Sequence, residues 1–119
     1  MPLLNFRKTL AALIVETGED NWDGESGTAI PVGDWGEVCV VVECVHERLP
    51  DLPEPHPSAG GDGSRHLRWS SPGRLFDVEI DRVQVLWSRR IDGVVTAGTC
   101  KGDMVALLAE TFSLKDVEG

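Results

Sequence analysis

The sequence has no tyrosine, no long apolar run and no cysteine pair at C-x-x-C spacing. No segment approaches the roughly 20 consecutive apolar residues that a membrane helix needs, so we expect neither a membrane span nor a membrane partner. The apolar stretch near the N-terminus lacks a basic lead-in and a small-residue cleavage site, and it continues into Glu16. This arrangement is typical of a helix of the fold rather than a signal peptide, and it favours a cytoplasmic location.

Cysteines are few, and their number is odd. Cys39, Cys44 and Cys100 suggest reduced thiols rather than a disulfide framework. With 119 residues, 41% of them hydrophobic, the chain is large enough to pack one domain without such links. We expect that domain to comprise an acidic helical half (1–49), a Pro/Gly linker (50–64) and a β-meander with a C-terminal helix (65–119).

Basic residues are scarce in the first half of the chain. Residues 1–64 hold 12 acidic and 3 basic residues, a net charge of −9, whereas residues 65–119 hold 8 of each and are neutral. A surface of this sign repels phosphate backbones, so we expect no direct nucleic-acid partner. Its natural complement is a basic protein surface. The alternative is that the acidity serves only solubility.

Two helices are expected in the acidic half. Apolar residues at 3/4 spacing predict an amphipathic helix over residues 3–16. Residues 38–45 have strand propensity, yet the apolar residues from Trp35 to Leu49 fall on one helical face. The run of about 15 residues exceeds a typical strand, and Pro50 ends it. We therefore prefer a helix to a strand for this segment.

After residue 64 the hydrophobic period becomes two, which predicts strands. Apolar and polar residues alternate over residues 66–70, 76–81 and 83–88. The dipeptide Asp92-Gly93 is a strong signal for a two-residue hairpin that leads to a further strand. We therefore expect an antiparallel meander of three or four strands.

The expected class is α+β, with two N-terminal helices, the meander, and one C-terminal helix packed on the apolar face of the sheet. Gly102-Asp103 provides the cap for the last helix. On the polar face of the sheet, Arg68 is placed to pair with Asp77 or Glu79 across neighbouring strands.

A turn with the sequence Asn21-Trp22-Asp23-Gly24 precedes a Pro31-led helix that ends at Leu49-Pro50. The second half contains three further short motifs: Gly63, Leu67-Arg68-Trp69 and Val78-Glu79-Ile80. The combination resembles small uncharacterised bacterial proteins with an N-W-D-G turn. Those proteins usually have Gly-Ala after the turn and a second helix richer in Ala and Leu. The group has no established activity, so the resemblance, over residues 3–112, implies topology only.

The loop around that turn is the densest cluster of oxygen ligands. As a calcium loop it would use Glu19, Asn21 and Asp23 at positions 1, 3 and 5. Position 12, which needs a bidentate Glu, is Ile30, so the site lacks its main anchor. The simpler interpretation is a capped turn. In such a turn, Asp or Asn side chains bond the backbone, and Trp22 covers the edge of the core.

Other catalytic or cofactor chemistry has weak support in the sequence. One stripe of the second predicted helix carries Cys39, Glu43 and His46, which would offer three of the four ligands of a zinc site. The simpler interpretation is the ordinary flank of a helix. No serine or cysteine lies in a nucleophile motif, and no G-x-G-x-x-G or Walker loop is present. We expect no cofactor and no metal, with a metal-dependent enzyme as an alternative.

The composition favours a non-catalytic protein whose acidic surface occupies a basic site on a partner, such as a nucleic-acid-handling protein. Phage anti-defence (anti-CRISPR-like) proteins, antitoxins and nuclease immunity proteins are of this kind. The residues expected to bind the partner are Glu19, Asp20, Trp22, Asp23, Glu25, Glu37, Glu43 and Glu47. A further alternative is a small structural module that forms a homodimer through a sheet edge or the Val-rich helix.

Overall fold

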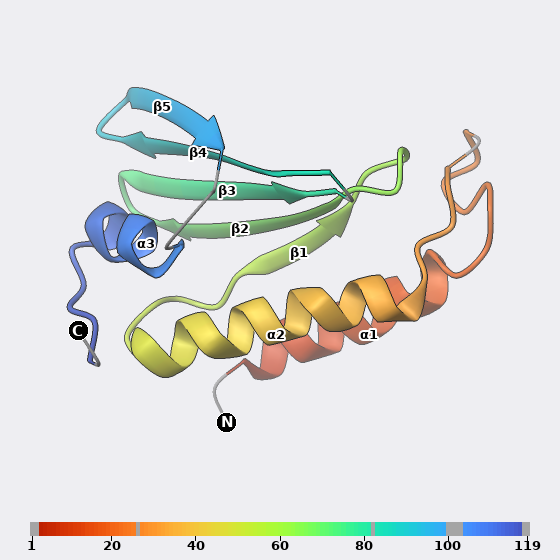
Figure 1. The fold of residues 1–119 in the computed structure, drawn as a ribbon, viewed down its shortest axis with the longest axis horizontal. Helices are drawn as coiled ribbons and strands as arrows, with labels where there is room; N and C mark the ends of the chain where they lie inside the picture. The colour runs from red at the N-terminus through yellow and green to blue at the C-terminus, as the bar shows by residue number, and fades with distance from the viewer. Residues whose placement is uncertain (1–2, 26, 82, 100–103, 118–119) are drawn as a thin grey trace.

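The computed structural model describes residues 3–25, 27–81, 83–99 and 104–117. Its elements follow the order α1, α2, β1 to β5, α3 (Figure 1). The helices are α1 (Leu4–Glu16), α2 (Val32–Arg48) and α3 (Met104–Phe112). The strands are β1 (His56–Ala59), β2 (Arg65–Ser71), β3 (Arg74–Ile80), β4 (Val85–Ile91) and β5 (Val94–Thr99). The α+β class, with two helices before the sheet and one after it, is confirmed.

The strands form one antiparallel sheet in chain order, so the expected meander is present. The expected count of three or four strands is wrong, because β1 lies within residues 50–64, the segment predicted as a linker. In β1, Pro57 lies opposite Leu67 of β2. Proline has no N–H and is confined to sheet edges, where β1 lies. The prolines that make this segment look like a linker are therefore compatible with a short edge strand.

For residues 38–45, the structure shows the helix and not the strand. The valines of α2 divide by helical phase: Val38, Val42 and Val45 are buried, whereas Val40 is 59% exposed. Strand propensity is overridden because these three side chains reach the core together only on a helix. None of the helices in the described ranges is long and apolar enough to cross a membrane.

The hairpin signal at the β4–β5 turn is confirmed. Asp92 and Gly93 both have positive φ, 49° and 85°, as a two-residue turn of type I′ requires. The alternation predicted from residue 83 begins later, because β4 starts at Val85 and Val83 lies in the preceding turn, 90% exposed. The predicted cap at residues 102–103 lies outside the described residues.

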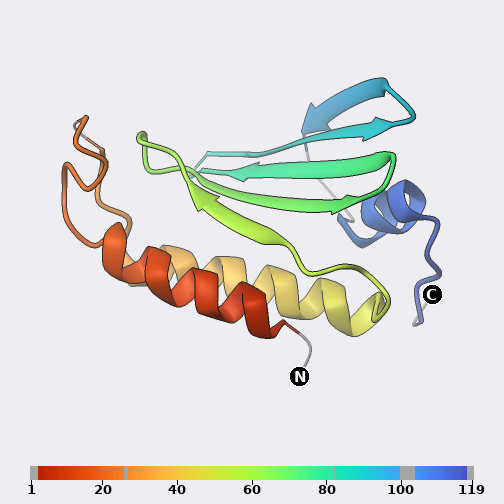
Figure 2. The same ribbon diagram turned by 180° about the vertical axis from the view of Figure 1, so that it is seen from behind.

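The core lies between the helices and one face of the sheet. α1 and α2 run together below the sheet with α1 against β1, and α3 lies against β3 (Figures 1 and 2). Trp35, Trp69 and Phe76 are fully buried between these layers. Phe76 of β3 stacks on Trp87 of β4 with ring centroids 5.9 Å apart, and its centroid lies 6.3 Å from that of Trp69 of β2. The Phe76 ring therefore packs against side chains of both neighbouring strands.

Candidate functional site

The loop between α1 and α2 is held in shape by its own acidic side chains. Asp23 Oδ1 accepts hydrogen bonds from the backbone N–H groups of Glu25 and Gly27, at 2.9 and 2.7 Å. The bond from Glu25 is the main cause that lowers the pKa of the Asp23 carboxyl below its usual 3.8. Asp20 Oδ1 accepts the N–H of Ala29 at 2.9 Å. Asp20 and Asp23 therefore fix the loop while their carboxylates remain at the surface.

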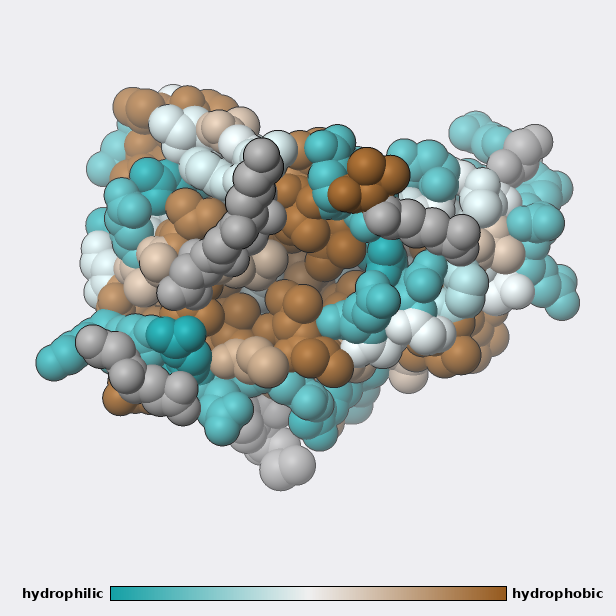
Figure 3. All heavy atoms as spheres, in the orientation of Figure 1, coloured by the Kyte–Doolittle hydropathy of each residue, from teal (hydrophilic) through white to brown (hydrophobic). Residues whose placement is uncertain are grey.

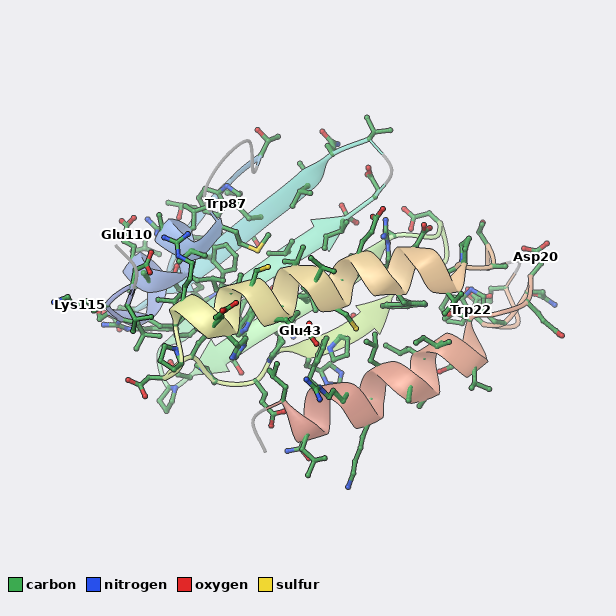
Figure 4. All side chains as sticks on the ribbon, turned by 60° about the horizontal axis from the view of Figure 1, so that its bottom comes forward. Asp20, Trp22, Glu43, Trp87, Glu110 and Lys115 are labelled. Carbon is green, nitrogen blue, oxygen red and sulfur yellow. The ribbon has the colours of Figure 1, made fainter. Side chains whose placement is uncertain are left out.

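The indole of Trp22 closes the same loop. Its Nε1 donates to the carbonyl oxygen of Thr28 at 2.9 Å, and the side chain is half-buried. Figure 4 shows Trp22 and Asp20 at one end of the molecule, beyond the start of α2. Glu19 and Glu25 are exposed on the same loop. The five loop residues predicted to bind a partner thus stay together.

This loop also contacts the sheet, which sequence reasoning missed. The Thr28 N–H donates to the carbonyl of Gly61 in the β1–β2 turn at 2.8 Å. A hollow of about 350 Å³ lies between the loop, the start of α2 and two turns of the sheet. It is lined by Thr28, Ala29, Asp34, Asp62, Gly63, Asp81 and Val83. Three aspartates that are distant in the sequence therefore share one hollow.

We name the carboxylates of this region the acidic end: Glu19, Asp20, Asp23, Glu25, Asp34, Glu37, Asp62 and Asp81. Beneath them lies Arg65, which is only 2% exposed. Its Nη1 donates to the carbonyl of Asp34 at 2.9 Å and lies 3.4 Å from Glu37 Oε2. Arg82, which follows Asp81 in the sequence, lies outside the described residues. The buried arginine partly offsets the repulsion among the carboxylates.

Glu43 and Glu47 are separated from the acidic end. On α2 they lie 6 and 10 residues beyond Glu37, which is roughly 9 and 15 Å along the axis. Glu43 pairs with Arg7 of α1 at 3.5 Å. Figure 4 shows Glu43 midway along α2, far from the labelled loop residues. The residues predicted to bind a partner therefore divide into two groups. Glu43 and Glu47 lie apart, and the other six lie at the acidic end, next to Asp34, Asp62 and Asp81.

The stripe Cys39, Glu43 and His46 does not converge on a common point. Glu43 faces Arg7, and His46 Nε2 accepts the indole N–H of Trp69 at 3.3 Å. Burial, followed by the Glu43 charge, raises the pKa of the Cys39 thiol, which disfavours the thiolate that metals bind. Within the described ranges, no group of three or more His, Cys, Asp or Glu side chains is arranged to hold a metal ion.

A second polar cluster lies where β2 begins. Ser64 Oγ is 3.0 Å from His66 Nε2, and the same nitrogen is 3.6 Å from Glu79 Oε1. The Ser64 hydroxyl also bonds Asp62 and is the main cause that lowers the pKa of that carboxyl. A Ser–His–acid relay needs the serine and the acid on different ring nitrogens, and Ser64 is itself buried. The cluster therefore holds the β1–β2 turn and lacks the geometry of an activated nucleophile.

His46 makes the stability of the fold depend on pH. Burial lowers its pKa below the usual 6.5, with the Glu54 charge opposing. The unfolded chain therefore binds the proton more readily than the folded chain. We expect the free energy of unfolding to decrease as pH falls below about 6.5, and to level off below the lowered pKa of the folded state. Urea denaturation at pH 8 and at about pH 5.5 measures the loss.

The variant His46→Gln keeps an acceptor for the Trp69 N–H but does not titrate, so its stability should change less between these two pH values. His56→Gln is the matched control, because the His56 side chain is exposed. Equal pH dependence in the native protein and in His46→Gln would show that another group carries the effect.

No family model, no curated protein and no solved structure matches this chain. The resemblance to small bacterial proteins with an N-W-D-G turn therefore stays a prediction.

Proposed function

We propose that this protein is a non-catalytic inhibitor that binds a basic surface of a partner protein through its acidic end. The partner of best chemical fit is a nucleic-acid-handling protein, because its binding groove is built to hold phosphate groups. Antitoxins, nuclease immunity proteins and anti-defence proteins of phages act in this manner, and the proposal places this protein among them.

The proposal rests on one observation: four separate segments bring carboxylates to the same end of the fold. They are the α1–α2 loop, the start of α2, the β1–β2 turn and the β3–β4 turn. Solubility requires only net charge and is served equally well by dispersed carboxylates. Gathering like charges costs repulsion. When a basic partner surface binds, attraction between its positive charges and these carboxylates would outweigh the repulsion among the carboxylates.

The anchoring of the loop suits this role. Asp20 and Asp23 have fixed positions because each accepts backbone N–H groups. Fixed carboxylates lose little side-chain entropy on binding, whereas the exposed Glu19 and Glu25 can adapt to the partner. The summed charge steers a basic partner from a distance, and at physiological salt this steering is screened beyond about 8 Å.

The decisive variant is Glu19→Lys/Glu25→Lys, which reverses two exposed charges and leaves the anchoring Asp20 and Asp23 in place. We expect it to bind the partner at least about tenfold more weakly, with most of the loss in the association rate. The measurement is capture from bacterial lysate at about 50 and about 500 mM salt, followed by surface plasmon resonance with the captured protein.

The matched control is Glu47→Lys/Asp51→Lys, which makes the same change in net charge near the opposite end of α2, at two exposed positions. It should keep most of the affinity. Equal losses in both double variants would mean that net charge alone governs capture. Unchanged capture in the loop variant would refute the proposal.

A further inference from the structure

The two edges of the sheet differ in how they are protected. β1 is four residues long, contains Pro57 and lies against α1. β5 has six residues, no proline and no charged residue, and it pairs with β4 without a bulge. On its other side it faces no strand among the residues that the structure describes. Natural sheets usually blunt such an edge with charge, proline or a bulge, and β5 has none of these.

The β4–β5 hairpin determines which backbone groups of β5 face β4 and which face the other way. In a two-residue type I′ hairpin the flanking pair, here Ile91 and Val94, exchanges hydrogen bonds, and such pairs then recur at every second residue. Residues 94, 96 and 98 therefore point their N–H and C=O groups at β4. Those of Val95, Ala97 and Thr99 point outward, away from the sheet.

Antiparallel pairing with a second β5 fits these groups. With Ala97 on a two-fold axis, Val95 lies opposite Thr99 of the second copy, and Ala97 lies opposite its own counterpart. Each outward N–H then meets an outward carbonyl. The side chains that face one another are small or β-branched, and Thr96 lies opposite Gly98 of the second copy. No bulky or charged pair obstructs this register.

Charge also favours a second copy at this edge. The chain carries a net charge of −9, so two copies repel unless they meet where the charge is balanced. On the outer face, Arg68 Nε of β2 bonds Asp77 Oδ1 of β3 at 2.9 Å, one of the two pairings expected from the sequence, and β4 separates both residues from β5. His66 lies 3.6 Å from Glu79 on the same face. On β4, directly beside β5, Arg89 Nε donates to Thr96 Oγ1 of β5 at 3.1 Å, and Arg89 Nη2 lies 3.2 Å from Glu110 Oε1, so this charge next to the edge is paired.

The acidic end is remote from this edge. Figure 1 shows the α1–α2 loop and β5 on opposite sides of the molecule. In the same view, Figure 3 shows hydrophobic atoms over the β4–β5 hairpin at the upper left and hydrophilic atoms over the loop at the right. Val94 and Val95 of β5 are 67% and 61% exposed. A contact between two β5 strands would therefore keep the two acidic ends apart.

We infer that β5 joins two copies of this chain into a symmetric dimer with a continuous ten-stranded antiparallel sheet. The contact is smaller than a standard interface of about 800 Å² per partner, so the dimer forms at micromolar or higher concentration. A hollow of about 680 Å³ on the outer face ends at Ala97 and Thr99 of β5. In the dimer the two hollows meet across the two-fold axis.

The test is the solution mass by sedimentation equilibrium from about 1 μM to about 1 mM. The mass should rise with concentration from 13.0 kDa towards twice that value. Ala97→Pro removes an outward N–H and leaves the ladder with β4 intact, and Val95→Lys places one added charge on each copy at the contact. Both variants should remain monomers over the whole range.

Val83→Lys is the matched control, because it makes the same substitution at an exposed valine outside β5, and it should dimerise like the native protein.

Hydrogen exchange gives a second readout. Amides 95, 97 and 99 should gain protection with concentration, whereas amides 96 and 98 should be protected throughout. A constant mass of 13.0 kDa, or a dimer that persists in Ala97→Pro and Val95→Lys, would overturn the inference. Glu19→Lys/Glu25→Lys should leave the mass curve unchanged, which separates this test from that of partner binding.

Discussion

Replacing Phe76 with alanine is expected to lower the free energy of unfolding by about 3–5 kcal/mol. Phe76 is fully buried, and its ring contacts Trp69 on β2 and Trp87 on β4. Truncation leaves a cavity between three strands and removes two aromatic contacts. Urea denaturation followed by tryptophan fluorescence measures the loss, because both neighbouring indoles report on the same site.

Phe76→Leu is the control for this prediction. It keeps most of the apolar volume and loses the ring contacts, so the expected cost is under about 1.5 kcal/mol. Near-ultraviolet circular dichroism should weaken in both variants, since the stacked pair Phe76–Trp87 is broken in each. A loss below about 1 kcal/mol in Phe76→Ala would mean that the surrounding side chains collapse into the cavity.

The elements that the sequence predicts correctly are those with a local periodic signal. α1 and α2 show one apolar helical face, and β2, β3 and β5 are marked by alternation or by the Asp92-Gly93 turn. β1 has no such signal, because a four-residue edge strand with a proline looks like a linker. Its pairing with β2 depends on the β1–β2 turn, where Gly63 has a φ of +88°. Periodicity alone does not reveal this pairing, although the two strands are neighbours in the sequence.

The candidate site was predictable in part for the same reason. The loop acids are adjacent in sequence and stay adjacent in space. Asp34, Asp62 and Asp81 come from three other segments and share a hollow with the loop only after the chain folds. The inclusion of Glu43 and Glu47 assumed that the acidic half forms one surface, whereas the length of α2 separates them from the loop.

The structural role of Asp20 and Asp23 was foreseen in outline. Asp side chains commonly bond nearby backbone groups, so a capped turn was expected beside a partner-binding role. The geometry allows both, because each carboxylate that holds the loop also remains at the surface. Charge reversal is therefore informative at Glu19 and Glu25 and would be ambiguous at the two aspartates.

The junction of α1 with this loop yields the second large expected effect. Thr17, fully buried at the end of α1, donates its hydroxyl to the Leu13 carbonyl at 2.7 Å and accepts the indole N–H of Trp35 at 3.0 Å. Thr17→Val keeps the shape but leaves the buried indole N–H without an acceptor. We expect a loss of about 1–3 kcal/mol in the free energy of unfolding.

A double-mutant cycle with Trp35→Phe isolates this bond, because phenylalanine has no N–H to leave unpaired. Once Trp35 is phenylalanine, Thr17→Val should cost less by about 1 kcal/mol or more, and additivity within about 0.5 kcal/mol would contradict the assigned bond. The Thr17 carbonyl also accepts the N–H of Ile30 at 2.8 Å, which closes the acidic loop. Thr17 thus contacts the end of α1, the buried indole of Trp35 and the loop. We therefore expect Thr17→Val to speed hydrogen exchange of the Ile30 amide as well. Phe76→Leu is the control, because it acts away from the loop and should leave this exchange rate unchanged.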